Sequence, residues 1–334
     1  HLRGLIEADE AAAQYSDLAE AVIRALWPRV VATFAARHGP PPGRGAAVLA
    51  MGSLGAGMLT AGSDLDLIVI YDPDGQSESN GRKPLSSTAY YAKLTQTLVT
   101  ALSARMAEGQ LYEVDMRLRP SGRQGPVATS LASFRQYQRE EAWTWEHLAL
   151  TRARAIAGAP DLCEAIEAFR RALLAEKGAP GPTCDDTAAM RARIAQAADA
   201  ARIANPWEAK LGRGRLQDIE LVSQAAALIA GDPARKPDAQ LAAGVAAGWL
   251  RAGQAERLAE AHGAFRRLNQ GARLLMDHPL DMAELGEGGR AFLLRETGAD
   301  SVEALQARLE ELRSAAEAEI DAILAPPATP DPQA

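Results

Sequence analysis

Apolar positions recur at helical spacing near the start of the chain and then give way to short apolar runs. Over residues 16–37 an apolar side chain returns every four residues, and this spacing predicts an amphipathic helix. The apolar run at 46–51 and the run at 63–71, whose end is β-branched, predict two strands. The glycine-rich segment between them, residues 52–57, is expected to form a loop.

Helical spacing returns over 88–107 and is followed by a strict alternation at 111–119, which predicts a strand. One face of this strand would be apolar, and the other face would carry Glu113, Asp115, Arg117 and Arg119. A loop is expected from Pro120 to Gly125, and a helix over roughly 131–150.

Beyond residue 159 the pattern is helical throughout. Helices are predicted over 161–176, 186–203, 217–230, 238–252, 254–277 and 301–324. The whole chain is therefore expected to have an α+β fold, with a small mixed sheet and flanking helices over residues 1–158 and an all-α helical bundle over 159–325. The proline-rich tail, 326–334, is expected to be disordered.

Composition narrows the class of protein. Acidic residues outnumber basic ones, 43 to 36, and this balance argues against a nucleic-acid partner. The two cysteines are too few for a disulfide framework, so we expect reduced thiols and a cytoplasmic location. No apolar stretch is long enough to predict a membrane span. Because the first residue is His1 and not Met, we expect a piece of a longer protein.

Three carboxylates suggest a metal site. Asp64 and Asp66 are two residues apart at the start of a predicted strand, so their side chains share a face, and Asp115 lies on the charged face of another strand. Close carboxylates repel each other unless a cation lies between them, and they favour Mg²⁺ or Mn²⁺ over softer metals. This arrangement is typical of sites that hold two metal ions for phosphoryl or nucleotidyl transfer.

Several residues near these carboxylates are candidates for binding phosphate. Gly52 and Ser53 form a turn whose backbone N–H groups are free to hold phosphate oxygens, and Ser63 directly precedes the first carboxylate. Arginine side chains match phosphate oxygens well, so the three arginines that follow Asp115 complete the set. These are Arg117, Arg119 and Arg123.

The combined pattern resembles a known family. Gly52-Ser53 followed by Asp64-Leu-Asp66 is similar to the nucleotidyltransferase superfamily that includes DNA polymerase β. The runs at 111–123 and 137–154 resemble bacterial glutamine synthetase adenylyltransferase, and a weaker resemblance covers 210–224, with Lys210, Asp218 and Glu220 of unassigned role. The chain departs from the family's pattern at Ser53, where a lysine or arginine is usual.

The resemblance implies an activity. This family carries two similar nucleotidyltransferase domains, one that adds AMP from ATP to glutamine synthetase and one that removes it by phosphorolysis. The segments 118–123 and 140–154 look like the AMP-adding copy. The implied function is transfer of AMP to a tyrosine hydroxyl with two Mg²⁺ ions, and the implied effectors of the full-length protein are the PII signal protein and glutamine.

Three alternatives remain open at this point. The first is the AMP-removing activity of the sister domain, which by the resemblance has the same three carboxylates. A nucleic-acid-extending enzyme of the superfamily is disfavoured by the acidic balance. A catalytically silent domain that binds a regulator is disfavoured by the intact Asp64, Asp66 and Asp115.

Overall fold

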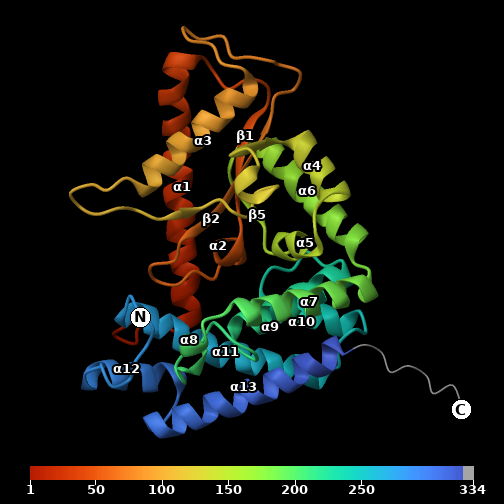
Figure 1. The fold of residues 1–334 in the computed structure, drawn as a ribbon. Coiled ribbons are helices and arrows are strands. Elements are labelled where there is room, and N and C mark those ends of the chain that lie inside the picture. The colour runs from red at the N-terminus through yellow and green to blue at the C-terminus, as the bar shows by residue number, and fades with distance from the viewer. Residues whose placement is uncertain (326–334) are drawn as a thin grey trace, which may run out of the picture. The chain divides into compact units, whose positions relative to one another are not determined.

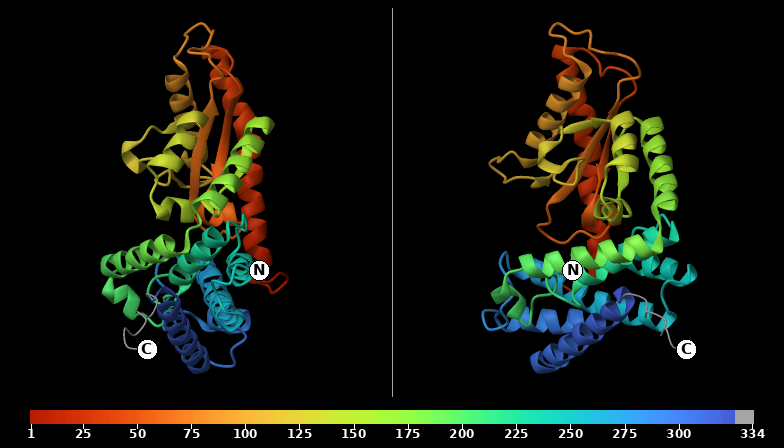
Figure 2. Two further views of the ribbon diagram at one scale, coloured as in Figure 1. Left: turned by 90° about the vertical axis from the view of Figure 1, so that its right-hand side faces the viewer. Right: turned by 45° about the vertical axis from the view of Figure 1, so that its right-hand side comes forward.

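The computed structural model describes residues 1–325, and the tail predicted to be disordered, 326–334, lies outside the described residues. The chain divides into two compact units (Figures 1 and 2). The first contains residues 3–176 together with 233–236, and the second contains 177–232 and the chain from Pro237 onward. The first unit thus continues to Glu176, beyond the residue 158 at which the sequence pattern divided the chain.

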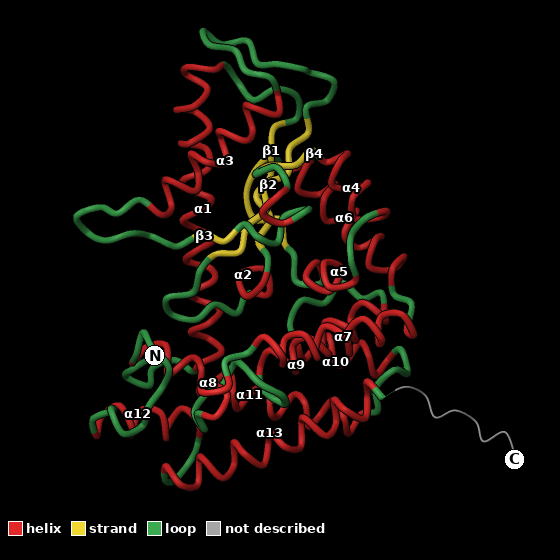
Figure 3. The backbone as a smooth tube through the Cα atoms, viewed as in Figure 1, coloured by secondary structure: helices red, strands yellow, loops and turns green. Residues whose placement is uncertain are grey.

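The first unit is built around a small mixed sheet, shown in yellow in Figure 3. Strand β1 pairs antiparallel with β2 and β5, whereas β3 and β4 pair parallel with successive parts of β2. The mixed sheet predicted from the sequence is confirmed. Its strands are β1 (Gly45–Ala50), β2 (Leu65–Asp72), β3 (Val114–Asp115), β4 (Ala128–Ser130) and β5 (Arg154–Gly158).

Helices cover both faces of this sheet (Figure 1). Strands β1 and β2 are therefore buried on both sides. Val48 and Val69 face a core completed by α1 and α3, and Leu49 and Ile68 face a second core completed by α4, α5 and α6. The helices are α1 (Ala8–His38), α2 (Gly52–Ala56), α3 (Ser87–Ser103), α4 (Leu131–Glu140), α5 (Thr144–Leu150) and α6 (Pro160–Lys177), with a 3-10 turn, η1 (Gly122–Gln124).

Helices are the only regular elements among the described residues of the second unit. An apolar core gathers residues from α9, α11, α12 and α13, among them Ile219, Leu268, Leu293 and Leu309. The helices are α7 (Pro180–Ala197), α8 (Ala200–Ala204), α9 (Leu216–Ala230), α10 (Pro237–Ala246), α11 (Ala252–Leu275), α12 (Glu287–Thr297) and α13 (Val302–Leu324). Helix α12 was not predicted, whereas the predicted absence of strands after residue 159 holds throughout the described chain.

The strand predicted over 111–119 is wrong for most of its length. Only Val114 and Asp115 pair with β2. The Asp115 carboxylate accepts a hydrogen bond from the Arg117 backbone N–H at 2.8 Å, and Arg119 N–H donates to the Met116 carbonyl at 3.3 Å. These bonds turn the backbone away from the sheet, because a local side-chain acceptor competes with the strand ladder.

Two other elements differ from the predictions. The segment 52–57, expected to be a loop, begins with the one-turn helix α2. The helix expected over 131–150 is broken between α4 and α5, where Glu146 Oε2 accepts a hydrogen bond from the Trp143 backbone N–H at 3.0 Å and so starts a new helix. Trp143 itself is left exposed.

Both cysteines, Cys163 and Cys184, are free thiols. None of the helices described for residues 1–325 is both long and apolar enough to span a membrane.

Candidate functional site

Two of the three candidate carboxylates are direct neighbours in the sheet. Strands β2 and β3 run parallel, and their register pairs Asp66 with Asp115. In a parallel pair, residues in register project to the same face, so these two side chains leave the sheet together. Asp64 lies two residues before Asp66, just outside the strand, and is exposed, whereas Asp66 and Asp115 are half-buried.

The turn that follows β1 lies against the Asp66 carboxylate. Met51 N–H donates to the Asp66 carbonyl at 2.9 Å. Gly52 has a positive φ of 52°, and a Cβ placed on it would lie 2.3 Å from Asp66 Oδ2. Glycine is therefore required here by both backbone conformation and space. The first residue of α2 consequently touches the carboxylate that the sequence assigned to metal.

Arg117 is the cation at the centre of the site. Its Nε donates to Asp115 Oδ2 at 2.6 Å, and this hydrogen bond is the main reason that the pKa of Asp115 lies below its ordinary value. The pKa of Arg117 is raised, mainly by the bond to Asp115 and further by the charges of Asp66 and Asp64. All three carboxylates thus act on one exposed guanidinium.

The other predicted phosphate-binding residues differ in how they are engaged. Arg119 donates to the backbone carbonyls of Met116 at 2.7 Å and of Gly125 and Arg123 at 3.3 Å each, so its donors brace the loop after β3. Arg123 is exposed, and its charge contributes to lowering the pKa of Asp115.

The two serines also differ. Ser63 Oγ accepts a hydrogen bond from Thr60 N–H at 3.0 Å and contacts Thr60 Oγ1 at 2.8 Å, which closes the turn before Asp64. Ser53 is half-buried in the first turn of α2, and its carbonyl accepts a hydrogen bond from Met58 N–H at 2.8 Å.

The three carboxylates are chemically suited to a hard divalent cation, but in the structure Asp115 is bound by Arg117. Carboxylate oxygens from Asp64, Asp66 and Asp115 are the ligands that Mg²⁺ and Mn²⁺ prefer. Within residues 1–325, however, no group of three acidic, histidine or cysteine side chains is spaced to hold an ion. Arg117 supplies the positive charge to Asp115 instead. The shared metal site therefore stays a prediction.

Sequence reasoning missed the ion pair that holds α2 in place. Glu20, a buried acid on the inner face of α1, forms an ion pair with Arg154 at 2.5 Å, and Arg154 also reaches the Leu54 carbonyl at 3.4 Å. Arg154 therefore connects β5, α1 and α2. The signal was present in the sequence: Glu20 stands between Ala19 and Ile23 in the apolar stripe of the first helix, where an unpaired acid is costly.

In the second unit, Asp218 is a structural residue. Its carboxylate is buried and bound by Arg191, with Nε–Oδ1 at 2.7 Å and Nη2–Oδ2 at 3.0 Å, and it also accepts the Gly214 N–H at 2.7 Å. Lys210 is exposed. Glu220 lies 3.5 Å from the buried ring nitrogen Nε2 of His262.

Comparison with known proteins places the chain among relatives of one kind. A model of the glutamate-ammonia ligase adenylyltransferase family matches residues 1–169. The chain is 40% identical over 327 residues to the bifunctional glutamine synthetase adenylyltransferase/adenylyl-removing enzyme of Mesorhizobium japonicum, a match that covers 97% of the chain and 33% of the relative. It is 42% identical to the Rhizobium meliloti enzyme of the same name, over 86% of the chain and 30% of the relative. The chain thus spans about a third of the length of these curated relatives.

Proposed function

Because the chain belongs to the glutamate-ammonia ligase adenylyltransferase family, we propose that it transfers AMP from ATP to a tyrosine hydroxyl of glutamine synthetase. The observation that carries the proposal is the pairing of Asp66 with Asp115 beside the Gly52 turn. This pairing joins two carboxylates with a backbone turn suited to phosphate, as nucleotidyl transfer requires.

In this proposal the carboxylates of Asp64, Asp66 and Asp115 hold two Mg²⁺ ions, or Mn²⁺ in their place. When bound, the ions neutralise phosphate charge and favour the ionised form of the attacking hydroxyl. Asp115 accepts the proton of the tyrosine hydroxyl. The tyrosine oxygen then bonds to the α-phosphorus as the bond to pyrophosphate breaks, and pyrophosphate leaves on the opposite side.

Arg117 has two successive partners in this scheme. In the structure it is bound to Asp115, which makes that carboxylate a weak base. We propose that the triphosphate draws Arg117 away, because an arginine fork binds phosphate oxygens as readily as carboxylate oxygens. Asp115 would then be released for its role only when the nucleotide is present. Arg123 would add a second positive charge near the triphosphate. The β- and γ-phosphates would be lined by Gly52, Ser53 and Ser63. Arg119 would hold the shape of the loop after β3.

The competing function is phosphorolytic removal of AMP from adenylylated glutamine synthetase. It is favoured by the names of the relatives, which include an adenylyl-removing activity. Two charges, on Arg117 and Arg123, suit a triphosphate better than a single phosphate, so we favour the adding reaction. By resemblance, PII protein and glutamine would act on the longer protein.

The test offers the chain both reactions. The 334-residue chain is mixed with glutamine synthetase, Mg²⁺ and ATP labelled in the α-phosphate, and in a second reaction with phosphate and adenylylated glutamine synthetase. We expect label on glutamine synthetase in the first reaction and its loss in Asp66→Asn. Release of ADP in the second reaction, without labelling in the first, would assign the chain to the removing activity.

A further inference from the structure

The second unit contains a cavity that the proposed reaction does not use. Its volume is about 780 Å³, and every residue that lines it belongs to the second unit. The walls come from α7, α8, the segment 211–215 before α9, the start of α9, and α13. Pockets for small organic ligands are usually about 300–1,000 Å³, so this one is large enough for such a molecule.

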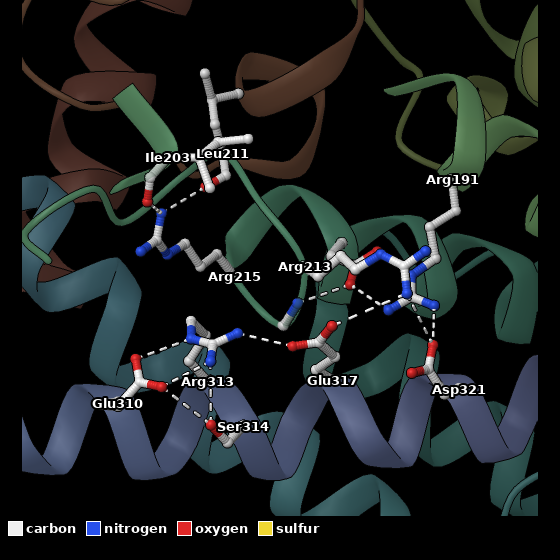
Figure 4. Close-up of polar contacts among 12 residues, drawn as sticks. Arg191, Ile203, Leu211, Arg213, Arg215, Glu310, Arg313, Ser314, Glu317 and Asp321 are labelled. Carbon is white, nitrogen blue, oxygen red and sulfur yellow. Dashed lines mark hydrogen bonds and ion pairs between the residues drawn. The ribbon is translucent and has the colours of Figure 1, made fainter. Parts of the chain in front are cut away.

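Two of the arginines at this cavity are fully matched by carboxylates, as Figure 4 shows. Arg191 is bound by Asp218 at 2.7 Å and also by Asp321. Arg313 is bound by Glu310 at 2.6 Å and by Glu317 at 2.7 Å. Neither guanidinium needs a further anion.

Arg215 is different. It is 6% exposed, yet within residues 1–325 no carboxylate lies within ion-pair distance of it. Its Nη1 donates to the carbonyls of Ile203 and Leu211 at 3.0 Å each (Figure 4), which are neutral partners. Burial lowers the pKa of Arg215, because the charged form has lost water, and the more distant charges of Glu208 and Glu310 offset this effect only in part.

The loop that presents Arg215 has a fixed shape. Gly212 and Gly214 both have positive φ, 112° and 71°. A Cβ on Gly214 would lie 2.1 Å from the Arg313 carbonyl, so this glycine allows the loop to press against α13. Arg215 is therefore held in place before any ligand arrives, which reduces the ordering cost of binding.

The rest of the lining indicates what else a ligand would carry. Ile194, Ile203, Leu211 and Leu221 contribute apolar surface. Gln217 also lines the cavity, and its Oε1 atom is buried and accepts no hydrogen bond from the described residues. A buried acceptor of this kind is costly unless a donor reaches it.

We propose that this cavity binds a small organic anion, with its charged group on Arg215, its apolar body against the isoleucine and leucine side chains, and a hydrogen-bond donor toward Gln217. The anionic group is a carboxylate or a phosphate ester. Nothing in this proposal depends on the reaction assigned to the first unit.

The test uses a matched pair of fluorescent probes and the whole chain. 8-Anilinonaphthalene-1-sulfonate has an anionic group, an N–H donor and an aromatic body, and N-phenyl-1-naphthylamine has the same body and donor without the charge. We expect saturable, tighter binding of the anionic probe. Arg215→Met should weaken the anionic probe by about tenfold to a hundredfold, the effect of a lost hydrogen bond to a charged group, and leave the neutral probe unchanged.

A second variant keeps the test valid if Arg215→Met does not fold. Ala195 is exposed on α7 and lines the cavity, so Ala195→Trp should fill it and abolish binding of both probes. Ala189 is exposed on the same helix and is not part of the lining, so Ala189→Trp should bind as the parent chain does. Equal binding of the two probes by the parent chain, or anionic binding that survives Ala195→Trp, would overturn the proposal.

Competition then identifies the anionic group. Displacement of the bound sulfonate probe by octanoate alone indicates a carboxylate ligand, and displacement by octyl phosphate alone indicates a phosphate ester. Displacement by both leaves the shared anion chemistry supported, whereas displacement by neither contradicts it.

Discussion

Asp66 and Asp115 stand side by side across the parallel pairing of β2 and β3, although 49 positions separate them in the chain. Strand β3 is only two residues long, so this pairing is almost its whole contribution to the sheet. A strand this short adds little to stability, and its consequence is to bring one carboxylate next to another.

The first prediction concerns this pair. Asp66→Asn and Asp115→Asn should each lower AMP transfer by about a thousandfold or more, because each removes a charge worth several kcal/mol in the transition state. Labelling of glutamine synthetase measures the rate, and circular dichroism checks the fold. Asp161→Asn is the control, since Asp161 is an exposed carboxylate whose ion pair, within residues 1–325, is with Arg44. Near-normal transfer by either site variant would exclude the proposed role.

The second prediction concerns Gly52. Gly52→Ala should abolish or strongly reduce transfer, because the new methyl group would press on Asp66 Oδ2. Gly57→Ala is a close control: Gly57 has a similar positive φ, 70°, but nothing lies within 4 Å of its Cβ position. Both variants should lose about 1–2 kcal/mol of unfolding free energy from backbone strain. If the two lose activity equally, the contact with Asp66 does not matter.

The third prediction follows from the lowered pKa of Asp115. Arg117→Gln removes the main cause of that shift, so the carboxylate should take up its proton at a higher pH than in the parent chain. The acidic limb of kcat/KM, which reports groups of the free enzyme, should therefore move to higher pH.

The same shift has a consequence for stability with a definite sign. A lowered pKa stabilises the fold above the pKa of the unfolded state, and this contribution is lost as pH falls through the folded value. Because Arg117 is exposed, the loss of unfolding free energy in Arg117→Gln should be small.

Arg117→Lys keeps the charge, so it should shift the acidic limb of kcat/KM less than Arg117→Gln does. An identical limb in all three proteins would mean that Asp115 does not control it.

How far the sequence predicts this site can be judged from single residues. Asp64, Asp66 and Asp115 were proposed as site residues from their spacing on predicted strands, and the structure pairs Asp66 with Asp115 in the sheet. The pattern could not show that the strand stops after Asp115, because alternation continues to Arg119 while the actual termination depends on hydrogen bonds to the backbone. When a side chain competes with the strand ladder for a backbone N–H group, the alternation of polar and apolar residues in the sequence does not change, so this pattern cannot reveal where the strand ends.

Other features depend on contacts between distant parts of the chain. Strand β5 was missed because Arg154–Gly158 shows no alternation and is specified by its partner β1. The second-unit cavity was missed as well, since it depends on Arg191 meeting Asp218 and on α13 meeting the 211–215 loop. Periodicity identifies most helices but does not say which charged residues will meet.

The fourth prediction concerns alkaline pH. Burial raises the pKa of Tyr90 to about 12 from an ordinary value of 10.0, and its hydroxyl donates to the Gly39 carbonyl at 2.9 Å. A raised pKa stabilises the fold below the unfolded value, and this contribution is lost as pH rises toward the folded one. Unfolding free energy should therefore fall above pH 10, and less steeply in Tyr90→Phe. Urea titrations across this range measure the slope, and an unchanged slope would refute the assignment.

The last prediction concerns the buried pair that supports the second unit. The side chains of Arg191 and Asp218 are 8% and 6% exposed, and removing one member leaves the other buried without its charge partner. Asp218→Asn should therefore cost about 3 kcal/mol of unfolding free energy, the lower end of the range for buried pairs, because Asp321 still contacts Arg191. Hydrogen exchange of α9 amides measures the stability of this unit separately from that of the first unit.

Two further variants serve as controls. Asp321 is half-exposed, so Asp321→Asn should cost only about 0–1 kcal/mol of unfolding free energy. The double variant Arg191→Met/Asp218→Leu removes both charges and should recover most of the loss. Equal costs for Asp218→Asn and Asp321→Asn would show that burial does not set the strength of this pair.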